Sequence, residues 1–150
     1  LIINLEKLYL SLKKIELKNS NINEYYKLSH KLGVAQKDLN KLQNKLFGIE
    51  CNFEELNGLD FKKGCYVGQE NTARIKLKNK LTKRLLPIEV IKGKLQTEDE
   101  IFQKDQPIGK ILIDSEYPFG LIKFKDKFNF SEEFESESAK IKFIKPVWMN

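Results

Sequence analysis

Apolar residues between positions 24 and 46 recur three and four residues apart, which is the spacing of one helix face. The pattern predicts a helix over residues 24–32 and a second, short helix over residues 38–46. The residues that carry it are Tyr25, Leu28 and Leu32, followed by Leu39, Leu42 and Leu46. An asparagine in the polar stretch 19–23 can cap the first helix, and Gly33 is a natural point for it to end.

The apolar pattern changes to a period of two beyond position 73. Apolar residues at 73, 75 and 77 alternate there with cations at 74, 76 and 78, which predicts a half-buried strand. Further strands are predicted over residues 84–91, 100–102, 108–113, 119–124 and 139–144. Turns are expected at residues 92–93, 105–107 and 117–118. Short strands with regular turns indicate a small antiparallel β-barrel.

Polar and irregular segments fill the rest of the pattern. Residues 50–61 are expected to form a loop, and the acidic, serine-rich stretch 132–137 a solvated loop. Short strands are expected at residues 1–3 and 14–17. His30 is interpreted as a surface or capping residue, and Trp148 as an anchor of the C-terminal tail on the barrel. A boundary near Leu77 divides the chain into residues 1–77 and 78–150, an α+β portion and a barrel.

Charge is concentrated in one segment. The chain has 150 residues and a net charge of +6, and residues 62–84 hold eight cations against a single anion, Glu70. This local excess of +7 leaves −1 for all other residues. Such a stripe attracts polyanions such as RNA. Lysines along a solvated edge strand, where they discourage edge-to-edge pairing, are the other interpretation.

Composition excludes several kinds of site. No apolar run approaches the length of a membrane span. Two cysteines, Cys51 and Cys65, are too few for a disulfide framework, and with one histidine a closed zinc site within this chain is not expected. A reducing cytoplasm or organelle matrix is the expected compartment. A disulfide between the two cysteines is the weaker alternative.

The most specific motif covers residues 62–74, Lys-Lys-Gly-Cys-Tyr-Val-Gly-Gln-Glu-Asn-Thr-Ala-Arg. Cys65 lies between Gly64 and Gly68, which allow the backbone to approach a partner closely. Neighbouring cations favour the thiolate form of a cysteine, so Cys65 is a candidate nucleophile, redox thiol or cluster ligand. The alternative is a buried cysteine that acts as a small hydrophobic residue.

Residues 63–70, Lys-Gly-Cys-Tyr-Val-Gly-Gln-Glu, resemble the signature of the YgfZ family of folate-binding-like proteins, relatives of the glycine-cleavage T-protein. Residues 46–61 are similar to the segment that precedes this signature, and residues 25–35 to the helix upstream of it. The resemblance implies an α+β fold, in which the C-terminal part of a folate-binding-like domain is followed by a small barrel. The chain is accordingly interpreted as a C-terminal fragment, with any tetrahydrofolate bound mainly by residues before Leu1.

The same resemblance implies a function in assembly or repair of iron–sulfur enzymes, with Cys65 as the distinguishing thiol. Iron–sulfur proteins or cluster-assembly factors are then the expected partners. The residues expected to bind the cofactor or to shape its site are Glu50, Gly64, Tyr66, Gly68, Gln69, Glu70 and Arg74. For Glu50 the alternative is a solvent-facing carboxylate. For Glu70 it is a surface ion pair with Arg74, four residues on.

Two other functions stay open at this point. A tetrahydrofolate-dependent aminomethyltransferase has the implied fold, but its signature lacks the cysteine. An RNA-associated factor in tRNA modification is the third possibility, with weak tRNA contact through the basic strand at residues 73–78.

Overall fold

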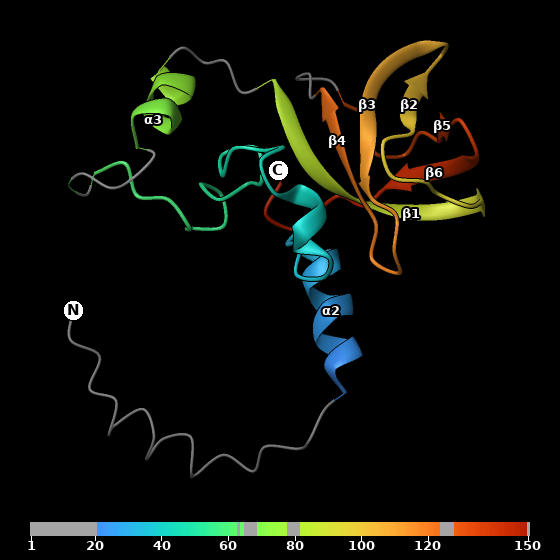
Figure 1. The fold of residues 1–150 in the computed structure, drawn as a ribbon, viewed down its shortest axis with the longest axis horizontal. Helices are drawn as coiled ribbons and strands as arrows, with labels where there is room; N and C mark the ends of the chain where they lie inside the picture. The colour runs from blue at the N-terminus through green and yellow to red at the C-terminus, as the bar shows by residue number, and fades with distance from the viewer. Residues whose placement is uncertain (1–20, 63, 65–68, 78–81, 124–127, 150) are drawn as a thin grey trace.

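The computed structural model describes residues 21–62, 64, 69–77, 82–123 and 128–149 (Figure 1). Six strands form a closed antiparallel barrel in the order β1-β4-β3-β2-β5-β6. Its strands are β1 (Lys83–Gly93), β2 (Glu100–Gln103), β3 (Gln106–Ile113), β4 (Phe119–Lys123), β5 (Phe134–Ser136) and β6 (Ala139–Phe143). The prediction of a small antiparallel barrel is confirmed, and five of its strands lie where the alternating pattern placed them.

Aliphatic side chains from every second strand position fill the barrel, because successive side chains of a strand point to opposite faces. Leu86, Ile101, Ile111, Ile122 and Ile141 are completely buried. The remaining large members of this core are Ile88, Leu95, Phe134 and Phe143. The interior therefore explains the apolar periodicity of the second half of the chain.

The barrel is closed by β5, a strand that the sequence pattern misses. Residues 132–137 were expected to form a solvated loop, and this prediction is wrong for β5. Phe134 is completely buried and lies opposite Ile141 of β6, while Glu135 and Ser136 pair with β2. Glu133 and Glu135, on either side of Phe134, are exposed. A single inward aromatic residue is too short a pattern to show alternation.

Helix α2 (Ile22–Lys31) confirms the first predicted helix. The Oδ1 atom of Asn21 accepts a hydrogen bond from the Asn23 amide at 3.0 Å, and Gly33 ends the helix with φ +72°. The buried face is not the predicted one, because Tyr25 and Leu28 are 50% and 56% exposed.

His30, expected at the surface, is buried against the barrel. Its Nε2 atom donates a hydrogen bond to the Pro118 carbonyl at 2.9 Å, and its ring packs edge-on against Phe119, with 5.1 Å between centroids. Burial lowers the pKa of His30, so the ring is neutral at pH 7. The helix docks through this polar aromatic residue rather than through its apolar stripe.

The second predicted helix, over residues 38–46, is a single 3₁₀ turn, η1 (Leu39–Leu42). Two residues after this turn, Asn44 has a φ of +60°. This left-handed conformation ends any helix there. The predicted loop over residues 50–61 is confirmed as a series of turns.

The strand predicted from residue 73 onward is wrong, since residues 69–77 form helix α3 (Gln69–Leu77). The alternation spans too few residues to outweigh helix-forming side chains. Glu70 lies in the first turn and Arg74 in the last, which suits the helix dipole, and the two form an ion pair of 2.6 Å. The cations assigned to a basic strand therefore start on a helix.

Trp148 was expected to hold the C-terminal tail on the barrel, and it binds the end of α2 instead. Its Nε1 atom donates a hydrogen bond to the Leu32 carbonyl at 2.7 Å. A side chain at Gly33 would meet Pro146 at 2.9 Å, so the tail also explains why this position is a glycine. The tail thus joins α2 to the last strand of the barrel.

Candidate functional site

The segment that precedes the cysteine motif packs on the outside of the barrel. Ala35, Leu42, Leu46 and Cys51 cover a small apolar cluster on the barrel wall. That cluster consists of Leu85, Leu112, Ile113 and Phe119. The apolar contact fixes residues 35–51 against strands β1, β3 and β4.

Three lysines at four-residue intervals reinforce this contact. Their ion pairs are Lys37 with Glu116, Lys41 with Asp114 and Lys45 with Glu98. The hydrogen bond from Lys41 holds the pKa of the Asp114 carboxyl below its usual value. Because all three pairs are at least a quarter exposed, each contributes little alone, and together they set the register of the segment on the barrel.

Asn52 attaches the next loop to the first strand. The Leu85 amide donates a hydrogen bond to the Glu50 carbonyl at 2.9 Å, and Asn52 Nδ2 donates to the Leu85 carbonyl at 2.8 Å. Asn52 is fully buried with φ +63°, a conformation that asparagine tolerates better than most residues. Arg84 donates to Asn52 Oδ1 at 3.1 Å and pairs with Glu55 at 2.5 Å. The loop therefore covers the edge of β1 at Leu85 in place of a neighbouring strand.

Replacing this asparagine is the first test of the attachment. We expect Asn52→Ala to lower the free energy of unfolding by about 1–3 kcal/mol, because the Leu85 carbonyl loses its buried donor. The matched control is Asn57→Ala, since exposed Asn57 has a similar φ of +58° and carries the same backbone strain. Urea denaturation of both variants measures the difference. Equal losses would show that strain, and not the buried hydrogen bonds, decides the effect.

Cys51 is the cysteine that the structure describes. Its thiol packs against the apolar cluster on the barrel wall. Burial and the nearby Glu50 carboxylate raise its pKa to about 11. It is free of a disulfide. At neutral pH this group is protonated and acts as a small hydrophobic residue, which is the opposite of a reactive cysteine.

Alkylation with iodoacetamide at pH 8 tests this assignment. We expect Cys51 to react on the order of 100-fold more slowly in the folded protein than in urea, because its thiolate fraction falls with the raised pKa. Peptide mapping by mass spectrometry measures the rate at each cysteine. Similar alkylation rates with and without urea would contradict the assignment.

The raised pKa of Cys51 also predicts a change of stability with pH. Above pH 9 the folded protein should lose stability as the pH rises toward about 11, where the buried thiol ionises.

A cavity of about 620 Å³ opens beside Cys51, between η1 and the loop. Its apolar walls include Leu39 and Phe53, which are 50% and 45% exposed. Polar groups reach it from Gln36, Asn40, Gln43 and Asn44. Glu50, Glu70 and Arg74 are not among the residues that line it.

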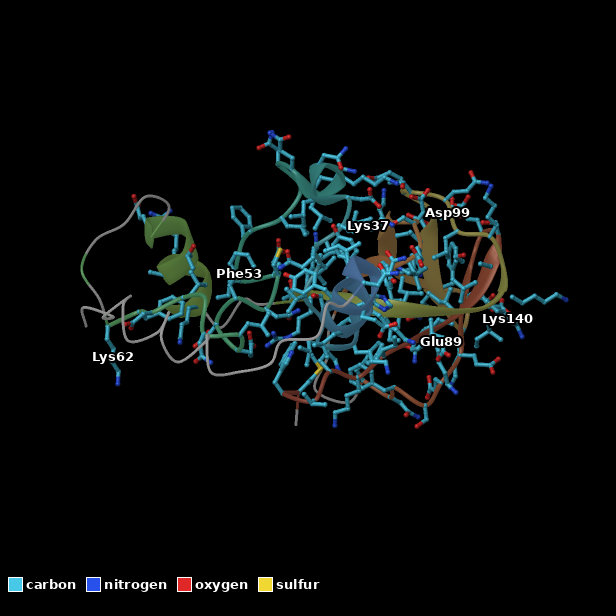
Figure 2. All side chains as sticks on the ribbon, turned by 90° about the horizontal axis from the view of Figure 1, so that it is seen from below. Lys37, Phe53, Lys62, Glu89, Asp99 and Lys140 are labelled. Carbon is cyan, nitrogen blue, oxygen red and sulfur yellow. The ribbon has the colours of Figure 1, made fainter. Side chains whose placement is uncertain are left out.

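The segment that leads into the cysteine motif extends away from the barrel. Figure 2 shows Lys62 at one end of the molecule and Lys140, on the barrel, at the other. The ammonium of Lys76 in α3 lies 4.0 Å from the ring centroid of Phe61 and pairs with Glu54. A side chain added at Gly64 would meet nothing within 4 Å. The described flanks of the motif are therefore open to a partner.

Apart from Gly64, described above, the predicted site residues fall in three groups. Cys65, Tyr66 and Gly68 lie outside the described residues. Gln69 and Glu70 begin α3, where exposed Glu70 pairs with Arg74 as the alternative interpretation expected. The Glu50 carboxylate accepts a hydrogen bond from the Phe47 amide at 3.0 Å, so it caps its own turn. The described members do not converge on one pocket.

The structure adds two residues that sequence reasoning missed, Asn52 and Arg84. Asn52 holds the loop to β1 through a buried hydrogen bond, and Arg84 through a part-buried one. No sequence motif indicates their role, because their hydrogen-bond partners are more than thirty residues away in the sequence.

The described part of the chain has no cluster of three or more histidine, cysteine or acidic residues that could hold a metal ion. None of its helices is both long and apolar enough to cross a bilayer.

Comparison with known proteins finds no matching family model. The chain is similar to proteins named iron-sulfur cluster assembly factor IBA57 homolog, mitochondrial. It is 38% identical over 61 residues to the one from Aspergillus oryzae, 38% over 77 residues to that from Dictyostelium discoideum, and 41% over 56 residues to that from Neurospora crassa. These matches cover 41%, 51% and 37% of this chain, but only 14%, 18% and 13% of the relatives.

Proposed function

We propose that this chain belongs to a folate-binding-like auxiliary protein that supports the assembly or repair of iron–sulfur clusters, with Cys65 as its functional thiol. The observation that carries the proposal is the similarity, at 33–41% identity, to relatives named as iron–sulfur cluster assembly factors. The glycine-flanked cysteine motif of residues 63–70 agrees with this role. Because the relatives are named as mitochondrial, an organelle matrix is the compartment we propose.

In this proposal the cluster is the substrate, and Cys65 supplies one thiolate ligand to it. Iron–sulfur clusters are held by about four ligands, so one cysteine is insufficient. Cys51 is a poor second ligand, because it is packed against the barrel and its pKa is about 11. The remaining ligands must come from a partner protein, and the exposed flanks of the motif leave room for one.

Tetrahydrofolate is the cofactor that the family resemblance implies. The described residues do not form a pocket for its pterin ring, since the Glu50 carboxylate bonds to its own turn and Glu70 to Arg74. We therefore derive no chemical step through folate, and assign its binding mainly to residues that precede this chain.

Complementation tests the proposal. The full-length protein, expressed in cells that lack their own factor of this kind, should restore the activity of a cluster-dependent enzyme. Restoration to the level of the native factor supports the function. Activity that stays at the level of empty vector, while the protein accumulates in folded form, contradicts it.

The two other functions give different results. An aminomethyltransferase would form methylene-tetrahydrofolate from an aminomethylated lipoyl donor, and the proposed factor should not. A tRNA-binding protein would show affinity that falls steeply with salt and is lost when Lys76, Lys78 and Lys80 are neutralised. In the structure Lys76 already pairs with Glu54, which weakens the case for direct contact.

A further inference from the structure

A hollow of about 800 Å³ lies between α2 and β1, separate from the cysteine motif. We call it the α2–β1 groove; Figure 1 shows both elements. Its aliphatic residues are Ile88, Val90, Ile144 and Val147. Val90 is 41% exposed and Val147 is 82% exposed. An apolar surface of this kind next to a strand is a place where another chain can bind.

Strand β1 is longer than either of its neighbours. Strand β4 pairs with residues 83–87 and β6 with residues 88–93, so each half of β1 has one edge that no strand covers. The first of these edges is filled by the loop, since the amide and carbonyl of Leu85 bind Glu50 and Asn52. The second edge is the one that faces the groove.

Hydrogen bonds determine which groups point into this second edge. The Ile88 amide donates to the Pro118 carbonyl at 2.9 Å on the β4 side, and the Pro87 carbonyl accepts from the Ile144 amide at 2.9 Å on the β6 side. The amide and carbonyl groups of successive strand residues point alternately to the two edges of the strand. Val90 lies two residues after Ile88, so its amide and carbonyl also point to the β4 side. Beyond Pro118, the described residues offer no partner strand for them.

Charge around the groove is positive. Its cations are Lys27, Lys31 and Lys145, and its anions are Glu89 and Glu116. Glu116 pairs with Lys37 outside the groove at 3.2 Å, whereas the three groove lysines form no ion pair with a described residue. In the groove wall the Ser115 hydroxyl is buried and has no hydrogen-bond partner among the described residues. A ligand with carboxylates complements this surface.

We propose that the α2–β1 groove binds a short, extended, acidic segment of a partner protein, which adds as a strand to β1 at Val90. Main-chain hydrogen bonds to Val90 provide affinity, and alternate side chains provide specificity. Apolar residues of the segment contact Val90 and Val147, and its carboxylates reach the lysines. The register shift between Val90 and Lys92 restricts the pairing to a few residues.

This site is independent of the proposed thiol chemistry, because none of its residues belongs to the segment 62–74. Loss of strand addition would leave the role of Cys65 untouched, and loss of thiol function would leave the groove intact. The two proposals therefore fail in separate experiments.

The test is a titration of the full chain with the blocked peptide acetyl-Glu-Val-Glu-Val-Glu-amide, followed by NMR. We expect the Val90 amide to shift and its hydrogen exchange to slow. Val90→Pro removes the amide hydrogen, for which the described residues offer no partner strand, and should weaken binding at least tenfold. Val90→Ile keeps the amide and should bind as the native chain does.

A second variant does not depend on the strand. Lys27→Glu with Lys31→Glu should also weaken binding at least tenfold, and the peptide acetyl-Lys-Val-Lys-Val-Lys-amide should not bind. Three results would overturn the proposal: absence of binding, equal binding by Val90→Pro, or a Val90 amide already protected in the free chain. The last would mean that another segment of this protein covers the edge.

Discussion

Cys65→Ala in the full-length protein should reduce restoration of cluster-dependent enzyme activity to the level of cells without the protein. The reason is chemical, because alanine lacks the sulfur that a cluster must contact. A thiol that serves the cluster and not the fold predicts an unchanged thermal unfolding midpoint. Enzyme activity and circular dichroism of the same preparation measure the two effects.

Two variants make this result specific. Cys65→Ser keeps the size of the side chain and should fail as alanine does, because a hydroxyl does not replace a thiolate at neutral pH. Cys51→Ala is the matched control and should retain activity, because that thiol is buried with a pKa of about 11. Full complementation by Cys65→Ala would refute the thiol role and leave the similarity to assembly factors without a mechanism.

Phe134→Ala should give the largest loss of stability in the described chain, about 3–5 kcal/mol. The ring is completely buried, stacks on Phe128 at 5.3 Å and meets Phe143 edge-on at 5.2 Å between centroids. Its strand also joins β2 to β6, so the cavity would form at the point where the barrel closes. Urea denaturation, followed by fluorescence, measures the change.

The control for this prediction lies on the same strand. Glu135→Ala removes an outward side chain whose ion pair with Lys140 is 3.9 Å long and largely exposed, so we expect a change within about 0.5 kcal/mol. A comparable loss in both variants would mean that β5 is stabilised by its main-chain pairing and not by the buried ring.

The barrel was predictable because patterns among neighbouring residues indicate most of its strands. In β6, buried residues alternate with exposed or half-buried ones over its five positions, whereas β1 contains a run of four buried residues, and turn residues separate the strands. Strand β5 escaped because three residues give no periodicity. Helix α3 was predicted as a strand because an alternation over only five residues, 73–77, does not distinguish a strand from a helix.

Local sequence patterns could not predict which polar residues are buried. His30 and Asn52 read as ordinary surface residues, yet each is buried through a hydrogen bond to a carbonyl on the barrel. Conversely, Tyr25 and Leu28 have the spacing of a core face and are half-exposed. Spacing shows which residues share a face, but the contact across the fold determines whether that face is covered.

The sequence by itself determined the barrel, the first helix and the cysteine motif, because alternation, capping and glycine spacing are properties of neighbouring residues. Only the tertiary structure decided the surroundings of Cys51, whose thiol is packed against barrel residues distant in sequence and has a pKa raised by burial and by Glu50. It also showed that a loop fills one edge of β1, and that no strand of the described residues covers the other edge at Val90. Those outcomes depend on which backbone groups meet across the fold, and hydrogen-bond partners more than thirty residues apart leave no local pattern.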